Sequence, residues 1–72
     1  MDKELPKNIK ETLDKWFGSI TYKLMYFWES FAGDTFYVVC VTSDDVGRDI
    51  HFIRIFYVGE SLELSVDHTD ST

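Results

Sequence analysis

The stretch IHFIRIFYVGESLELSV, residues 50–66, decides the fold, because it fixes a hairpin and separates its two sides. If residues 59–60 form a two-residue turn, Tyr57 faces Leu62 and Ile55 faces Leu64. A slip of one residue would set these apolar side chains opposite polar ones and mix the two sides. The register therefore predicts one buried side, made of His51, Ile53, Ile55, Tyr57, Leu62, Leu64 and Val66.

The N-terminal part of the chain predicts an amphipathic helix over residues 6–17. Its apolar residues recur at helical spacing and form one stripe: Leu5, Ile9, Leu13, Trp16 and Phe17. Pro6 suits the first turn, where its missing N–H leaves no bond unmade, and Gly18 suits the stop. We expect this stripe to pack on the buried side of the hairpin.

Strand patterns cover most of the remaining sequence, at residues 19–29, 35–43, 49–58 and 61–67. The predicted fold is α+β, with one N-terminal helix packed on a four-stranded antiparallel meander sheet in the order 1-2-3-4, as two layers. The alternative is a small curved β-barrel with the same helix. We expect one domain over residues 1–67 and a frayed polar tail over 68–72, which contains no apolar residue.

The four segments are richer in apolar residues than a sheet with one buried face requires. Simple alternation along residues 19–29 places Tyr22, Leu24, Tyr26 and Trp28 on one side, and Lys23, Met25 and Phe27 on the other. Residues 35–43 are apolar on both sides, so either Phe36, Val38 and Cys40 or Tyr37, Val39 and Val41 would face outward. Since one helix covers one side, the second side is predicted to be an association surface.

Charge and length indicate what kind of partner this surface meets. The chain has 72 residues and a net charge of −6, and residues 24–72 alone hold two arginines against nine acids. Such a surface repels phosphate backbones, so we expect no direct nucleic-acid binding. A chain this small is marginal alone, and one cysteine allows no internal disulfide, which favours a homodimer, a basic protein target or both. With neither a signal peptide nor a membrane-length apolar run, we expect no membrane association and a cytoplasmic location.

No catalytic residue, metal site or cofactor is predicted. Cys40 lies in an apolar strand, where burial raises a thiol's pKa and makes it inert. His51 and His68 would face each other if the hairpin pairing extended that far, but no short-spaced ligand motif supports a metal. Asp44, Asp45 and Asp49 lack the spacing of a calcium loop and are interpreted as a solvated turn.

The function expected from these observations is that of a small acidic, non-enzymatic protein–protein interaction module. By analogy of size, acidity and lack of catalytic chemistry, the expected role is that of an inhibitor or immunity-type protein, such as phages and bacterial conflict systems encode. One alternative is a ligand-binding or enzymatic domain with an apolar cavity between helix and sheet. Its mouth would hold Tyr22, Tyr26, Trp28, His51 and Tyr57. Another is a subunit of a larger assembly. The expected partner-binding residues are Met25, Phe27, Phe52, Arg54, Phe56, Asp44, Asp45, Asp49 and Glu63.

Overall fold

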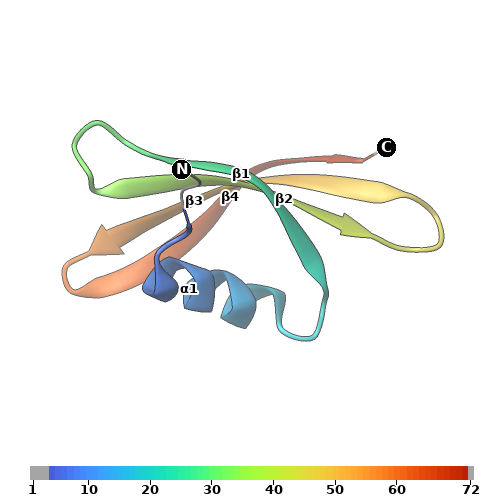
Figure 1. Ribbon diagram of the computed structural model, residues 1–72, viewed down its shortest axis with the longest axis horizontal. Helices are drawn as coiled ribbons and strands as arrows, with labels where there is room; N and C mark the ends of the chain where they lie inside the picture. Colours follow the sequence, from blue (N-terminus) through green and yellow to red (C-terminus); the bar gives the residue numbers. More distant parts are fainter. Residues whose placement is uncertain (1–3, 72) are drawn as a thin grey trace.

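The computed structural model describes residues 4–71, in which one helix packs on one side of a four-stranded sheet (Figure 1). Helix α1 spans Lys7–Phe17, and the strands are β1 (Tyr22–Glu29), β2 (Thr35–Ser43), β3 (Arg48–Val58) and β4 (Ser61–Ser71). Strands adjacent in the chain pair antiparallel, in the order β1-β2-β3-β4. The predicted α+β meander is confirmed, and its sheet is open rather than closed into a barrel.

Helix α1 begins one residue later than predicted and ends where predicted. Pro6 precedes it with an extended backbone, and Gly18 follows it with a φ of 64°, donating its backbone N–H to the carbonyl of Asp14 at 2.9 Å. A left-handed residue at this place costs glycine little, because glycine has no Cβ. Trp16 was assigned to the apolar stripe, but it is 48% exposed and meets the His51 ring edge-on.

The core lies between α1 and one side of the sheet, which we call the inner face. Its buried residues are Ile9, Leu13 and Phe17 of α1, Val38 and Cys40 of β2, and Ile53 and Ile55 of β3. The choice left open for β2 is thereby settled, because Val38 and Cys40 face the helix. Tyr37, Val39 and Val41 then face the other side, which we call the outer face.

The β3–β4 hairpin has the predicted register from Val58↔Ser61 to Ile53↔Val66. Gly59 takes a φ of 63°, as the first central residue of a type II′ turn does. Beyond Val66 the register shifts by one, because Asp67 is an extra residue, a β-bulge. His68 therefore pairs with Phe52 rather than with His51. The frayed tail predicted from residue 68 onward is wrong up to Ser71, since β4 stays paired to Ser71↔Asp49; Thr72 lies outside the described residues.

A second bulge interrupts β1. Leu24 pairs with Cys40 and Tyr26 pairs with Val39, so Met25 is an extra residue. Beyond it the alternation of sides is inverted relative to a regular strand. Phe27 was predicted on the uncovered side, but it packs against the core on the inner face. Tyr26 and Trp28 were predicted beside Leu24, and they lie on the outer face instead.

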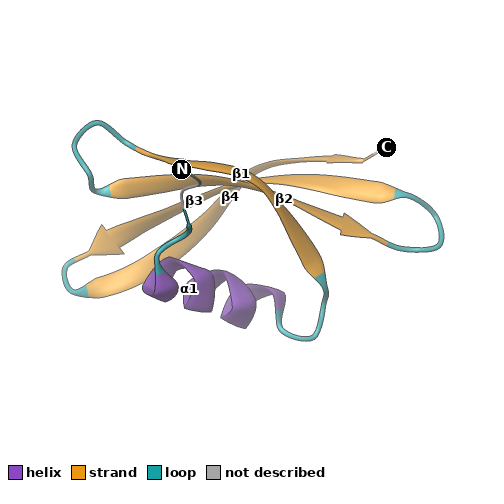
Figure 2. Ribbon diagram, viewed as in Figure 1, coloured by secondary structure: helices purple, strands orange, loops and turns teal. Residues whose placement is uncertain are grey.

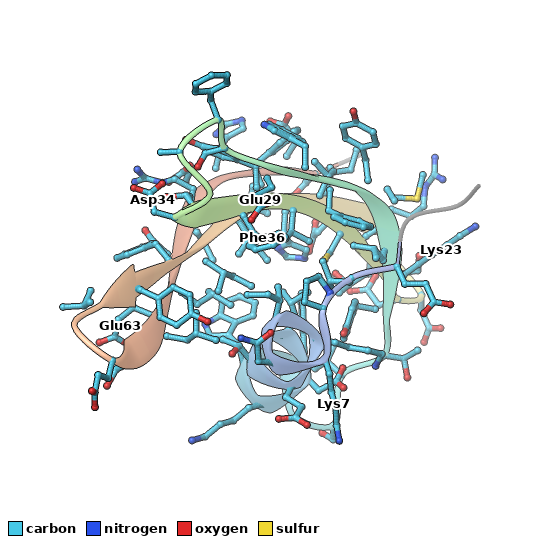
Figure 3. The ribbon with its side chains drawn as sticks, turned by 60° about the vertical axis from the view of Figure 1, so that its left-hand side comes forward. Lys7, Lys23, Glu29, Asp34, Phe36 and Glu63 are labelled. Carbon is cyan, nitrogen blue, oxygen red and sulfur yellow. The ribbon has the colours of Figure 1, made fainter. Side chains whose placement is uncertain are left out.

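The sheet is twisted and arches over the helix. Figure 2 shows the helix beneath the strands, and Figure 3, which looks nearly along α1, shows Phe36 on the helix side of the ribbon. The same view places Lys23 of β1 and Glu63 of β4 at opposite edges of the sheet. The outer face is consequently the convex one.

Candidate interaction surface

The outer face carries apolar side chains from three of the four strands. Cross-strand neighbours point to the same side of a sheet, so the registers define its rows directly. One row runs Tyr26–Val39–Phe52–His68 and the next runs Trp28–Tyr37–Arg54–Ser65. Its apolar members are Tyr26, Trp28, Tyr37, Val39, Val41, Ile50, Phe52, Phe56 and Val58. Within residues 4–71, no other element packs over this side of the sheet.

Aromatic rings on this face contact one another. Trp28 stacks on Tyr37 with ring centroids 5.1 Å apart and an interplanar angle of 15°. Tyr26 lies tilted against Trp28 at 5.4 Å. Tyr26 and Trp28 nevertheless remain 62% and 44% exposed. Rings that are held in place yet exposed offer contact area at little cost in side-chain entropy, as hot-spot residues do.

The charges on the outer face nearly balance, unlike those of the whole chain. Arg54 donates from Nε to the Asp67 carboxylate at 2.8 Å, and both side chains are partly exposed. The remaining charges lie at the margins of the face: Lys23 on β1, Arg48 at the start of β3, and Glu63 and Asp70 on β4. Three cations against three carboxylates balance, whereas the chain carries −6. The excess acids therefore lie mainly in the turns and at the ends of the sheet, since α1 holds three lysines against two acids.

Five of the predicted partner-binding residues are placed on the sheet by the structure as follows. Phe52, Arg54 and Phe56 of β3 and Glu63 of β4 share the outer face. Met25 is the bulge residue of β1 and is 55% exposed.

The three predicted aspartates are gathered around the β2–β3 connection. The Asp44 carboxylate accepts hydrogen bonds from the backbone N–H groups of Val46 and Gly47 at 2.8 and 3.0 Å, and these bonds lower its pKa. Asp45 is exposed in the same turn, while Asp49 lies in β3 and accepts a hydrogen bond from Ser71 at 2.8 Å. Asp44 thus shapes the turn, as the sequence suggested, and Asp44 and Asp45 are both exposed to solvent.

Sequence reasoning missed Tyr26 and Trp28 as members of this surface and left Tyr37 as one of two alternatives. The sequence does contain an indication that Tyr26 and Trp28 face outward. Keeping strict alternation buries Tyr26 and Trp28 and exposes Phe27, although phenylalanine is the most apolar of the three. An extra residue between Leu24 and Phe27 would have put both of these on the core side.

Two hollows lie beside β1. The larger, about 800 Å³, is lined by Leu5, Lys10, Asp14, Ile20, Leu24 and Phe27 among others. The second, about 720 Å³, lies by the Pro6 end of the helix and the far end of β1. Of the residues expected at a cavity mouth, Tyr22 lines the first hollow, and Tyr26 and Trp28 line the second. His51 and Tyr57 line neither.

A hydrogen-bonded group borders the larger hollow. The Asp14 carboxylate accepts from the Tyr22 hydroxyl at 2.5 Å and from Lys10 Nζ at 2.9 Å. Both bonds stabilise the anion, so they lower the pKa of Asp14. Burial, and then the bond to Asp14, raise the pKa of Tyr22 well above its usual value. The group therefore ties α1 to β1, and the Tyr22 phenol is a poor acid.

The cysteine and both histidines lie on the sheet, where Cys40 pairs across the strands with His51 and His68 pairs with Phe52. Burial raises the pKa of the Cys40 thiol to about 11, as the apolar strand predicted. His51 lies on the inner face with its Nε2 2.9 Å from the Thr42 hydroxyl, while His68 points outward to Asp70 at 2.5 Å. In residues 4–71, no three His, Cys, Asp or Glu side chains gather as a metal site would require.

No family model, curated protein or solved structure matches this chain. The one helix of the described chain is too short to cross a membrane.

Proposed function

We propose that this chain is a small acidic, non-enzymatic protein–protein interaction module and that its outer face is the contact surface. The observation that carries the proposal is the cluster of three aromatic side chains, Tyr26, Trp28 and Tyr37. Their rings contact one another on a sheet face that nothing in residues 4–71 covers. Contiguous exposed apolar surface of this kind marks interaction sites in small domains.

Charge favours a protein partner with a basic surface. Glu29, Asp34 and Glu60 lie near one end of the sheet, and Asp45 lies at the other. Acids at the rim raise the rate of encounter with a basic partner, while the uncharged centre supplies the desolvated contact. The exposed faces of tryptophan and tyrosine also attract arginine and lysine side chains.

A role as an inhibitor or immunity-type protein follows from this mode of action. Such a protein acts by occupying its partner's surface, so it requires a rigid contact face and no reacting group. A cytoplasmic site of action belongs to the same proposal. So does the lack of direct nucleic-acid binding, which rests on the charge pattern.

Co-purification with matched variants tests the proposal. We compare the wild-type chain with Phe52→Asp on the outer face and with Ile20→Asp, which adds the same charge beside the larger hollow. We expect a basic protein to be captured by the wild type and by Ile20→Asp, to be lost with Phe52→Asp, and to be released by added salt. Loss with Ile20→Asp alone would move the contact surface to the hollow.

The larger hollow supports a second candidate function, that of a small-ligand-binding domain. Its volume of about 800 Å³ lies in the range that such sites occupy, and Leu5, Leu24 and Phe27 give it apolar walls. Titration with an apolar dye, followed by tryptophan fluorescence, tests this function. Saturable binding that Ile20→Asp abolishes would favour it, and failure to saturate would remove it.

A further inference from the structure

We propose that a second copy of this chain packs on the outer face, with the two sheets face to face and β1 of each copy lying over β4 of the other. This inference rests on the proposed function in taking the outer face as a contact surface. It adds the identity of one occupant and the orientation in which that occupant sits.

The edges of the sheet argue against association by strand addition. Both edge strands contain a bulge, at Met25 in β1 and at Asp67 in β4, and β4 also carries several acids. Bulges and charges are the features with which proteins prevent edge-to-edge pairing. The outer face is then the apolar part of the sheet left for a second copy.

Charge restricts where two copies of a −6 chain can touch. Contacts through the turns and the ends of the sheet would set acid against acid, but the outer face is close to neutral. Its charges are also sorted by edge: Lys23 lies on the β1 edge, and Asp70 lies on the β4 edge in the same row. A two-fold axis parallel to the strands sets each Lys23 across from the partner's Asp70 at the edges of the contact, so opposite charges attract each other at two places.

The same axis matches side chains along the central rows. β2 then lies over the partner's β3, which puts Val39 over the partner's Phe52 and Tyr37 over the partner's Arg54. The first pair is apolar, and the second sets a guanidinium on an aromatic ring. Trp28 falls over the partner's Ser65, so a large side chain faces a small one.

The size of the face sets the strength of the dimer. Four strands of about eight residues offer roughly 500 Å² per copy at normal strand spacing. Two copies would therefore bury about 1,000 Å², the lower limit for a specific interface. Because the outer face is convex (Figure 3), the central strands make the closest contact. We expect a dimer in the micromolar range rather than an obligate one.

A charge-swap series tests both the dimer and its orientation by sedimentation equilibrium of the full chain at low salt. Lys23→Glu sets like charges together at two places, and we expect it to weaken the dimer about three- to tenfold. Asp70→Lys should weaken it similarly. The double variant Lys23→Glu/Asp70→Lys should restore it. Lys23 and Asp70 lie on opposite edge strands of one chain, so a contact within the chain does not explain such rescue.

Lys7→Glu is the matched control, because it makes the same change of net charge on the helix, away from the outer face (Figure 3). If Lys7→Glu weakens the dimer as much as Lys23→Glu does, the change in net charge alone explains the weakening, and the proposed orientation is overturned. A chain that stays monomeric at all concentrations would overturn the dimer. It would leave the binding of a basic partner at the same face intact, because the co-purification experiment tests that separately.

Discussion

Ile55 shows most directly how single residues hold this small fold together. Its side chain is fully buried between α1 and the sheet, and it pairs with Phe36 on one side and Leu64 on the other. A core with so few fully buried side chains leaves little surplus stability. Truncating one of them should therefore be felt by the whole domain.

We predict that Ile55→Ala lowers the free energy of unfolding by about 2–5 kcal/mol, because the truncation removes buried methyl groups and leaves a cavity. Urea denaturation followed by circular dichroism measures this change. Val58→Ala, at an exposed site on the same strand, is the control and should change stability little. A change near zero in Ile55→Ala, with a large loss in Val58→Ala, would mean that the inner and outer sides have been exchanged.

The Asp14–Tyr22 bond gives a prediction about pH. The folded-state pKa of Asp14 is lowered, so its contribution to stability is present above the unfolded pKa, near the usual 3.8, and is lost as the pH falls through the folded pKa. Tyr22→Phe removes the principal donor while the Lys10 contact remains. We expect the pKa of Asp14 to rise towards 3.8 without reaching it.

Carboxyl carbon chemical shifts, followed between about pH 2 and 6 where aspartates titrate, report this pKa directly. Tyr26→Phe serves as the control, because Tyr26 lies on the outer face among other rings. An unchanged Asp14 pKa in Tyr22→Phe would assign the lowering to Lys10 alone.

At the scale of elements, the chain beyond Val66 contributes to the sheet although it looks like a polar tail. Ser71 donates to Asp49 at 2.8 Å, and the Thr69 hydroxyl lies 3.5 Å from Nδ1 of His51. We predict that deleting residues 68–72 lowers the free energy of unfolding by roughly 1–3 kcal/mol, because ladder hydrogen bonds are lost. Deleting Thr72 alone controls for the new chain end. Thermal unfolding measures the difference. If both deleted forms unfold at the same midpoint temperature, the pairing of residues 68–71 with β3 is contradicted.

The sequence predicted the elements well and the two bulges not at all. A Gly-Glu turn between alternating segments is enough to fix the β3–β4 register, because only one register keeps Ile55 and Leu64 on one side. The insertion of one residue at Met25 or Asp67 follows from no local pattern, yet each moves every later side chain to the other face.

The candidate surface was predicted only in part, because its residues on β3 and β4 follow from the hairpin register whereas those on β1 depend on the bulge at Met25. Phe52, Arg54, Phe56 and Glu63 follow from the hairpin register and were placed correctly on the outer side. Phe27 was placed there wrongly, because the bulge at Met25 lies between it and the residues that set its phase. The two sides of β2 are equally apolar, so only the packing of the helix against Val38 and Cys40 decides between them.

At the scale of the whole molecule, the described chain forms two layers, a helix and a sheet, and the outer face of the sheet is uncovered. One helix covers the inner face, and the outer face supplies the apolar area that a second copy or a basic target would cover. The net charge of −6 keeps copies apart elsewhere, which directs association to the nearly neutral face.

We predict that Phe56→Glu converts a dimer to a monomer while the helix content stays the same, since Phe56 lies on the outer face between Thr35 and Glu63. Tyr57→Glu is the matched control: the neighbouring side chain points the other way, where Asn8 donates to its hydroxyl at 2.9 Å. Analytical ultracentrifugation with circular dichroism distinguishes the two. A dimer that survives Phe56→Glu but not Tyr57→Glu would place the interface on the helix side.

The most direct measurement is a dilution series of the full chain, followed by methyl chemical shifts. Neighbouring methyl-bearing residues on the same strands point to opposite sides, with Val39 and Ile50 outward and Val38 and Ile53 inward. Our account predicts shifts that depend on concentration at Val39 and Ile50 and constant shifts at Val38 and Ile53. Changes confined to the inward pair, or none at any concentration, would contradict it.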